Sequence, residues 1–366
     1  MTNKVVMVVS NSFLPDPRVH REANSLLANG FQVVVYAWDR KCTYPLNELL
    51  DGILIKRIRL KSGYGNFLKS LLTLPIFWVS LLPRIYLEKI DVIHCHDFDT
   101  VPVGLALKAL RRKTQLVYDA HEYYAAMVAD QTPSFICRLL RWVDSIFART
   151  VDQVIIPCEA RKRLYPEAKA IFIVPNTPKS AEISAMHGKK KFSVFYAGNL
   201  AKENGILVAA QAVQCLPNTE LVLAGEGPLS SILKNMNNIR YLGFINRRQV
   251  LENLACADTT FVFYEPTNIN NICSASNKLF EAMMIGVPVI INEETTQSKI
   301  VTDYKCGVVV RYGDIAALRR ELVKLKNDPS LRKTLGLNGK KAFRENFAWE
   351  IVERNLINAY KSLLNH

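Results

Sequence analysis

The stretch that decides the fold is SNKLFEAMMIGVPVI, residues 276–290. Ser276 can accept a hydrogen bond from an N–H of the next turn, which is how many helices begin. Gly286 can take the left-handed conformation that ends a helix, and Pro288 prevents the helix from continuing. The apolar run at 287–291 is typical of a strand covered on both faces. The stretch therefore predicts a helix followed directly by a strand of a parallel sheet.

The start of this predicted helix carries groups that can hold an anion and a sugar. Unpaired N–H groups at a helix N-terminus attract anions, and Asn277 lies in that first turn. Lys278 and Glu281 are three residues apart, so they share one face of the helix. Lys278 adds charge for a phosphate, and the Glu281 carboxylate can bind a sugar diol. The alternative is a solvated Lys–Glu pair, which is the usual role of such a pair.

Short apolar segments alternate with helix-like stretches on both sides of this motif. Strands are expected at 5–9, 32–36, 53–59, 92–94, 116–118, 154–156, 171–174, 192–196, 221–224, 239–242, 259–263, 287–291 and 308–310. Such alternation predicts mostly parallel sheets with helices on both faces. A turn at 175–178 and a lysine run at 189–191 interrupt the pattern, which then starts again.

This interruption predicts an α/β protein with two doubly wound, Rossmann-like domains, residues 1–178 and 179–346. A final amphipathic helix is expected within 347–366 and is assigned to the first domain. Ligands of open α/β sheets bind beyond the carboxyl ends of the strands. We therefore expect the two domains to face a central cleft that holds the ligands.

The bulk composition narrows the class of protein. The chain has 366 residues, with 47 basic and 33 acidic side chains and a formal net charge of +14. Its eight cysteines show no metal or disulfide spacing, which favours a reduced, cytoplasmic protein. A basic chain can bind nucleic acid, phosphorylated ligands or an anionic membrane. The sequence has no nucleic-acid-binding motif, so we expect no nucleic-acid partner.

Residues 70–83 form an apolar segment without a charge. The segment is too short to span a bilayer, and Pro75 and Pro83 are expected to interrupt it. Phe77, Trp78 and the leucines of the segment, with Lys61 and Arg84 nearby, could lie in the interface of an anionic membrane. This would make the protein peripheral on the inner face. Burial of the segment as a helix of the first domain is an equally good alternative.

Two histidines stand at the end of a predicted strand in the first half. His94 and His96 alternate along that strand and so face the same side. The DFD sequence at 97–99 imitates the D-x-D metal motif, and we interpret it as a coincidence. Two histidines satisfied by local partners are the structural alternative.

A second polar segment, YDAHE at 118–122, also follows a predicted strand. It places His121 and Glu122 at the same edge of the sheet as the first histidine pair. The structural alternative is that Asp119 or Glu122 simply caps the following helix.

A third segment, NSFLPDPRVHRE at 11–22, joins the first strand to the first helix. This is the usual place for a phosphate or acceptor loop. Asp16 and Arg18 lie in it. The Arg18 guanidinium could bind an anionic ligand there. The alternative is that Arg18 pairs with Glu22 on the helix surface.

Glycine-containing turns follow three strands of the second half, at 196–205, 224–228 and 243–245. Glycine lets the backbone approach a ligand closely, although turn chemistry alone can explain each of them. These turns contain Gly198, Asn199, Lys202, Glu226, Phe244 and Ile245.

The order and spacing of these segments resemble glycosyltransferase family 4, the retaining transferases that use nucleotide sugars. The resemblance covers nearly the whole chain and includes DPRV at 16–19 and SNKLFE at 276–281. The family usually has two glutamates separated by seven residues. Glu281 matches the second of them, whereas Cys273 stands in place of the first. The chain thus resembles the subset that keeps S/P-N-K-L-F-E alone.

The resemblance implies the GT-B fold, with the nucleotide-sugar donor held by the second domain. Glu281 would hold the ribose, beside Asn277, and the backbone at Phe244 and Ile245 would hold the base. Asn199 and Asn204 replace basic residues of the family. The diphosphate would therefore depend on Lys278, Lys202 or backbone amides, and Gly198 and Glu226 complete the implied donor site.

The resemblance also implies roles in the first, acceptor-side domain. His96 would reach the transferred sugar, and His121 and Glu122 would position the acceptor hydroxyl. Arg18, with Asp16, would reach an anionic acceptor or the donor phosphate. His96, His121 and Lys278 are therefore the expected catalytic residues.

The implied activity is transfer of a hexose-type sugar from a UDP- or GDP-linked donor to a glycan or lipid-linked acceptor, in cell-surface polysaccharide or glycolipid synthesis. The resemblance implies no cofactor and no metal, because cationic side chains take that role. The alternatives are a nucleotide-sugar epimerase on the same fold and a non-catalytic nucleotide-sugar binder. The neutral Asn199, Asn204 and Cys273 suggest the latter, and the donor sugar, base, acceptor and linkage stay open.

Overall fold

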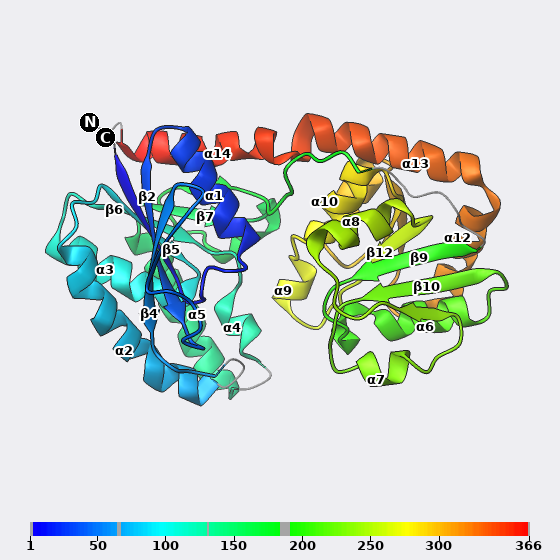
Figure 1. Cartoon of the computed structure of the whole chain (residues 1–366), viewed down its shortest axis with the longest axis horizontal. Coiled ribbons are helices and arrows are strands. Elements are labelled where there is room, and N and C mark those ends of the chain that lie inside the picture. Colours follow the sequence, from blue (N-terminus) through cyan, green and yellow to red (C-terminus); the bar gives the residue numbers. More distant parts are fainter. Residues whose placement is uncertain (1–2, 64–66, 130–131, 184–190, 365–366) are drawn as a thin grey trace. The chain divides into compact units, whose positions relative to one another are not determined.

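The computed structural model describes residues 3–63, 67–129, 132–183 and 191–364, with the backbone alone for 67–71. The chain forms two compact units, residues 1–175 with 353–366, and residues 176–352. Each unit is a sheet with helices on both faces (Figure 1).

The described strands of the first unit form one sheet in the order β3-β4-β2-β1-β5-β6-β7-β8. Neighbouring strands are parallel, except that β3 pairs antiparallel with β4. The strands are β1 (Lys4–Val9), β2 (Gln32–Asp39), β3 (Asn47–Leu50), β4 (Ile53–Arg59), β5 (Val92–His96), β6 (Gln115–Asp119), β7 (Gln153–Ile156) and β8 (Ile171–Ile173). The chain order reverses between β1 and β5, which marks the edge where ligands of such sheets bind.

Helices connect these strands, and the end of the chain packs on the same unit. The helices are α1 (Pro17–Ala28), α2 (Phe67–Tyr86), α3 (Val101–Leu110), α4 (Tyr124–Met127), α5 (Ser134–Thr150) and the short 3₁₀ helices η1 (Phe98–Thr100) and η3 (Glu159–Leu164). The last helix, α14 (Trp349–Leu364), reaches this sheet. The Tyr360 hydroxyl lies 2.6 Å from His94 Nδ1, and Gln153 donates to the Ser362 hydroxyl at 2.7 Å.

The second unit has a fully parallel sheet in the order β11-β10-β9-β12-β13-β14. This is the strand order of a Rossmann fold, with its reversal between β9 and β12. The strands are β9 (Phe192–Ala197), β10 (Thr219–Ala224), β11 (Ile239–Tyr241), β12 (Thr259–Val262), β13 (Val289–Asn292) and β14 (Gly307–Val310).

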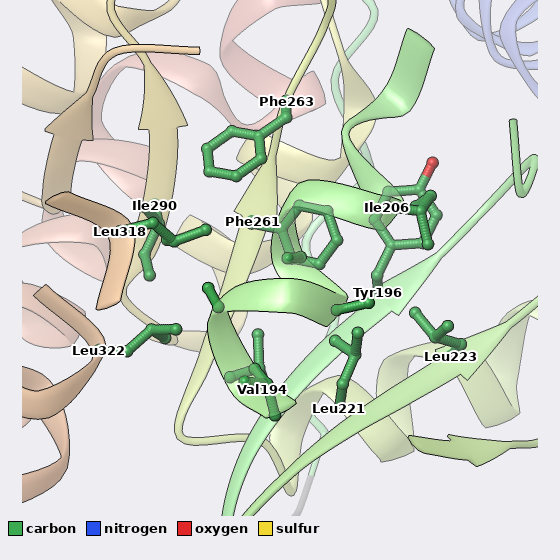
Figure 2. Close-up of a cluster of buried hydrophobic side chains, with 14 of the residues drawn as sticks. Val194, Tyr196, Ile206, Leu221, Leu223, Phe261, Phe263, Ile290, Leu318 and Leu322 are labelled. Atoms are coloured by element: carbon green, nitrogen blue, oxygen red, sulfur yellow. The ribbon is translucent and has the colours of Figure 1, made fainter. Parts of the chain in front are cut away.

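Alternate side chains of β9 enter two different hydrophobic cores. Val194 and Tyr196 join the cluster shown in Figure 2, together with Leu318 and Leu322. Phe195 points to the opposite face of the sheet and joins the second cluster. The helices are η4 (Lys202–Asn204), α6 (Ile206–Gln214), α7 (Ser230–Leu233), α8 (Arg247–Ala255), α9 (Ile269–Ile272), α10 (Asn277–Ile285), α11 (Ser298–Asp303), α12 (Ile315–Asn327), α13 (Pro329–Ala342) and the π-helical turn η5 (Phe343–Phe347).

The motif at 276–290 folds as predicted. The Ser276 hydroxyl accepts from the Lys278 N–H at 3.3 Å and begins α10. Gly286 ends the helix with φ +86°. The following strand β13 begins at Val289, slightly later than expected, because Pro288 cannot donate to a sheet ladder.

The apolar segment at 70–83 lies in α2, and one prediction about it is wrong. Pro75 and Pro83 do not interrupt the helix, which is continuous through both. Phe77 is fully buried and the Trp78 indole N–H donates to the Asp99 carbonyl at 2.7 Å, whereas Leu72, Ile76 and Val79 of the same helix are exposed. Burial removes Phe77 from any lipid interface, and contact of the helix with a membrane stays a prediction. Among the described residues, no helix is both long enough and apolar enough to cross a membrane.

Candidate active site

A pocket of about 460 Å³ opens at the carboxyl ends of β9, β10 and β11 in the second unit. It lies beside β9, where the strand order reverses. Its lining brings together six residues predicted for the donor, from four separate segments: Gly198, Asn199, Glu226, Phe244, Ile245 and Glu281. The remaining lining residues are Ala197, Ala224, Gly225, Arg247 and Val250.

Two glycines let the loops of this pocket lie directly against each other. Gly225 has φ +117°, and a Cβ there would lie 2.0 Å from the Gly198 carbonyl oxygen. A Cβ on Gly227 would lie 2.6 Å from the Leu200 nitrogen. Side chains at these positions would push the loops apart, so the glycines form the backbone wall of the pocket.

Glu281 reaches the pocket wall from α10 and pairs with Arg247 of α8. Its Oε1 lies 2.9 Å from the Arg247 guanidinium, and the arginine is 48% exposed. An exposed cation is easily displaced, so the pair can open to offer the carboxylate to a sugar diol. Arg247 was missed in the sequence. The available signal was the helix start beside it, where Asn246 and Gln249 form a reciprocal capping box.

Lys278 lies between two aromatic rings at the edge of the pocket. Its Nζ is 5.1 Å from the Tyr196 ring centre and 5.6 Å from that of Tyr264. A Cβ on Gly198 would lie 3.0 Å from Lys278 Cε, which places the lysine stem against the pocket wall. Burial disfavours its charge, but the Tyr264 and Tyr196 hydroxyls raise the pKa of Lys278 above its ordinary value. The ammonium group is therefore fixed and charged at neutral pH.

Asn199 and Asn204, the neutral residues of the loop after β9, make hydrogen bonds within that loop. Asn204 is buried and donates to the Asn199 carbonyl at 2.9 Å. The Tyr196 hydroxyl donates to the same carbonyl at 3.1 Å. Neither Lys202 nor Lys278 is among the lining residues, but Lys202 is exposed in η4 whereas the Lys278 stem lies against Gly198 of the pocket wall.

Two further predicted positions lie near the start of α10 but outside the pocket lining. The side-chain oxygen of Asn277 is buried and has no hydrogen-bond partner among the described residues. Cys273 is fully buried, at the end of α9. A glutamate in its place would have to leave the interior to reach a ligand.

In the first unit, polar side chains converge on Asp119, the last residue of β6. Asp119 pairs with the Arg18 guanidinium. It lies 3.0 Å from His96 Nδ1 and 3.4 Å from His121 Nδ1. Burial opposes the charge of this carboxylate, but Arg18 and His121 hold the pKa of Asp119 well below its ordinary value. The alternative pairing of Arg18 with Glu22 on the surface is therefore wrong, because Glu22 is buried.

Both histidines keep one ring nitrogen available. His96 Nε2 and His121 Nε2 are buried and have no hydrogen-bond partner within the described part of the chain. Asp119 faces Nδ1 of each ring, which favours the tautomer with the proton on Nδ1. Each Nε2 can then accept a hydrogen bond from a ligand hydroxyl.

Asp97 follows β5 in a strained conformation, with φ +64°. Its carboxylate lies 3.5 Å from Arg18 and accepts from the Glu122 N–H at 3.2 Å. Glu122 itself lies 3.9 Å from Arg161 and caps no helix, because Tyr123 precedes α4. Strain of this kind costs about 1–3 kcal/mol and persists where surrounding contacts impose it. Here those contacts join the ends of β5 and β6.

Asp16 holds the predicted loop after β1. Its side chain caps α1 by accepting from the Val19 N–H at 3.1 Å, and it also accepts from Asn11 at 2.8 Å. Arg18 leaves this capped turn toward Asp119 and Asp97. Asp16 therefore positions Arg18.

A buried group beneath these residues has the residue types of a metal site. Ligand atoms of Glu22, His94, His96 and Asp119 lie within 4.8 Å of one another. The His94 and His96 rings stack with centres 4.2 Å apart. Burial and the Asp119 charge raise the pKa of Glu22 well above its ordinary value, and burial and His96 lower that of His94. Glu22 Oε2, His94 Nε2 and His96 Nε2 are buried and make no hydrogen bond within the described residues.

The chain has two α/β units built on mostly parallel sheets, and one of them has a glycine-walled pocket at the ends of its strands. This is the architecture of the GT-B class of glycosyltransferases. Residues 18–177 match the family described as Glycosyltransferase Family 4, and residues 179–342 match Glycosyl transferases group 1. The chain therefore belongs to the glycosyltransferases of the group 1 and family 4 type, as the sequence motifs indicated.

Individual relatives agree with this assignment. An uncharacterised glycosyltransferase of Methanocaldococcus jannaschii is 24% identical over 93% of this chain and 92% of its own. A GDP-mannose-dependent monoacylated alpha-(1-6)-phosphatidylinositol monomannoside mannosyltransferase of Corynebacterium glutamicum is 27% identical over 42% of this chain and 41% of its own. The structure of sucrose-phosphate synthase from Thermosynechococcus elongatus superposes with a TM-score of 0.83 at 18% identity, over 99% of both chains.

Proposed function

We propose that this glycosyltransferase moves a hexose-type sugar from a nucleoside diphosphate sugar to a glycan or lipid-linked acceptor. The observation that carries the proposal is the pocket of the second unit, where Glu281 reaches the wall and Lys278 stands fixed at its edge. The carboxylate suits the ribose diol, and the ammonium and the α10 N-terminus suit the diphosphate. The backbone at Phe244 and Ile245 would hold the base.

In the proposed reaction, an acceptor oxygen forms a bond to the anomeric carbon while the bond from that carbon to the diphosphate breaks. The acceptor proton passes to a diphosphate oxygen on the same face, so configuration is retained. Lys278 stabilises the charge that develops on the leaving diphosphate. His96 would bind a hydroxyl of the transferred sugar through Nε2, while His121 and Glu122 would align the acceptor.

The relative from Corynebacterium glutamicum bears a name that couples a GDP-linked mannose to a glycolipid acceptor. We therefore put GDP-mannose first among the donors to be tested, with UDP-linked hexoses next. The proposed setting is cell-surface polysaccharide or glycolipid synthesis, on the cytoplasmic side of the membrane. No metal or other cofactor is part of the proposal.

The test combines calorimetric binding of nucleotide sugars with a transfer assay. Glu281→Gln should weaken binding of the selected donor at least tenfold, because it removes the charge that holds the ribose. Glu252→Gln is the matched control, since Glu252 pairs with Arg248 on the exposed face of α8. Equal affinities of wild type and Glu281→Gln would remove the ribose assignment.

The catalytic part is tested separately. His96→Ala should lower kcat at least tenfold and leave binding of the nucleoside diphosphate alone within twofold, because His96 lies in the first unit. Proton NMR of the product then reads the anomeric configuration, and an inverted product would overturn the retaining mechanism.

A non-catalytic nucleotide-sugar binder is the second candidate, favoured by the structural role of Asn204 and the burial of Cys273. Tight donor binding without transfer to any glycan or lipid-linked acceptor, and without donor hydrolysis, would support it over the enzyme.

A further inference from the structure

Helix α5 presents large apolar side chains to solvent. Phe135, Leu139 and Trp142 are 62%, 54% and 60% exposed. They are spaced four and three residues apart, so they form one stripe along the helix. Burying large apolar side chains is favourable, and the fold of this unit leaves these three in contact with water.

The opposite side of α5 already packs on the first unit. Cys137, Asp144 and Ala148 are buried there. Asp144 accepts hydrogen bonds from the Tyr118 and Tyr165 hydroxyls, at 2.9 and 3.2 Å. These buried residues therefore explain how α5 attaches to its sheet. They do not explain why the stripe of Phe135, Leu139 and Trp142 is exposed.

The outer side of α5 is also positively charged. Arg138 and Arg141 are exposed beside the apolar stripe. Neither arginine has an ion-pair partner in the part of the chain that the structure describes. Asp144, the one acidic residue in the sequence of this helix, is buried on the inner side. An apolar stripe with unbalanced arginines is complementary to a layer of anionic lipid headgroups.

Helix α2 provides a useful contrast. Its outward residues Leu72, Ile76 and Val79 are 73%, 53% and 70% exposed, also in one stripe. No charged residue lies between positions 72 and 79. An anionic membrane would therefore prefer α5 to α2.

We infer that the outer face of α5, formed by Phe135, Arg138, Leu139, Arg141 and Trp142, docks on an anionic membrane surface. The three apolar side chains enter the headgroup boundary, and the two guanidinium groups bind lipid phosphates. This surface shares none of the residues of the two polar sites, so the inference holds or fails separately from the proposed transfer.

Trp142 provides a direct signal for this contact. Trp38 and Trp349 are fully buried, and the Trp78 indole donates to the Asp99 carbonyl. Vesicles of phosphatidylcholine with one third phosphatidylglycerol should shift the tryptophan emission of the full chain to shorter wavelength and sediment with the protein. Phosphatidylcholine vesicles should do so at least tenfold more weakly, and salt should weaken the anionic contact. Trp142→Phe should still bind but lose the shift.

Variants then locate the surface. Phe135→Ser with Leu139→Ser, and separately Arg138→Gln with Arg141→Gln, should each lower the vesicle partition constant at least tenfold. The matched control, Leu72→Ser with Val79→Ser on α2, should stay within twofold of wild type. Circular dichroism and urea denaturation check that each variant keeps the fold of the first unit.

Three results would overturn the inference. One is the absence of sedimentation with anionic vesicles at low salt. Another is a larger loss for the α2 variant than for the α5 variants. The third is a dimer on gel filtration that the α5 variants convert to monomer, because a second copy of the chain would then be the partner.

Discussion

Asp119 shows how one buried residue organises the polar site of the first unit. It is fully buried and pairs with Arg18, His96 and His121. The same arginine also pairs with Asp97, whose side chain is 34% exposed. Asp119 and Asp97 thus share one cation but differ greatly in solvent exposure. The loss of stability on removing each charge can therefore be compared directly.

We predict that Asp119→Asn lowers the free energy of unfolding by about 3 kcal/mol, because it leaves the Arg18 charge buried without its main partner. The same change at Asp97 should cost less than about 1 kcal/mol, since water screens an exposed pair. Urea denaturation of both variants measures the difference. Equal losses would mean that Asp119 does not hold Arg18.

Asp144 predicts a pH dependence. Burial raises its pKa to about 6, despite hydrogen bonds from Tyr118 and Tyr165. The folded state therefore binds a proton more tightly than the unfolded state, and this contribution to stability falls as pH rises from about 4 to 6. Asp144→Asn, which cannot ionise, should gain about 2 kcal/mol relative to wild type between pH 4 and pH 7.5. Thermal unfolding at both pH values measures this, and a constant difference would contradict it.

The start of α10 is the element that joins stability to the proposed donor site. The Ser276 hydroxyl caps it, and the Ser276 N–H donates to Gln297 at 3.0 Å. The capped turn holds Lys278 beside Tyr196 and carries Glu281 to the pocket. Loss of the cap should therefore affect both folding and binding.

We predict that Ser276→Ala lowers the free energy of unfolding by about 1 kcal/mol and weakens nucleotide binding severalfold. Asp314→Ala is the matched control. Asp314 caps α12 by accepting from the Ala317 N–H at 2.8 Å, away from the pocket lining. It should cost similar stability without changing affinity. Comparable affinity losses in the two variants would show that the effect of Ser276 is only stability.

Elements set by local chemistry were predicted well from the sequence. The 276–290 motif follows from a capping serine, a helix-ending glycine and a proline, and β4 has the bounds expected for 53–59. The edge strand β3 was missed because its burial depends on pairing with β4. The two prolines of α2 misled the prediction, because packing of the helix against its neighbours outweighs the local cost of proline.

The site was predicted in position but not in its pairings. Chain order places Arg18, His96 and His121 at the ends of parallel strands, so their proximity follows from topology. The shared counter-ion Asp119 was considered only as a helix cap, since contacts across strands are not visible in one segment. Arg247 was missed for the same reason, because its partner Glu281 is far along the chain.

At the scale of the whole molecule, each unit has its own sheet, and the predicted donor groups all belong to residues 176–352. Ligand binding stabilises whatever part of a protein holds the ligand, by about 2.7 kcal/mol at a hundredfold excess over Kd. The two units should therefore respond differently to a nucleoside diphosphate alone. This response can be read at single segments by hydrogen exchange.

We predict that GDP or UDP, whichever binds, slows amide exchange in the loops at 197–200, 224–228 and 243–247 and in the first turn of α10. The segments after β5 and β6 in the first unit, 97–99 and 120–122, should exchange at unchanged rates, because the proposed site holds nucleoside and diphosphate by groups of the second unit alone. Glu281→Gln serves as the control and should abolish the protection at the same nucleotide concentration. Equal protection in both units would show that the first unit also holds the diphosphate, through a cation such as Arg18. Protection of the first unit alone would reverse the assignment of donor and acceptor sides.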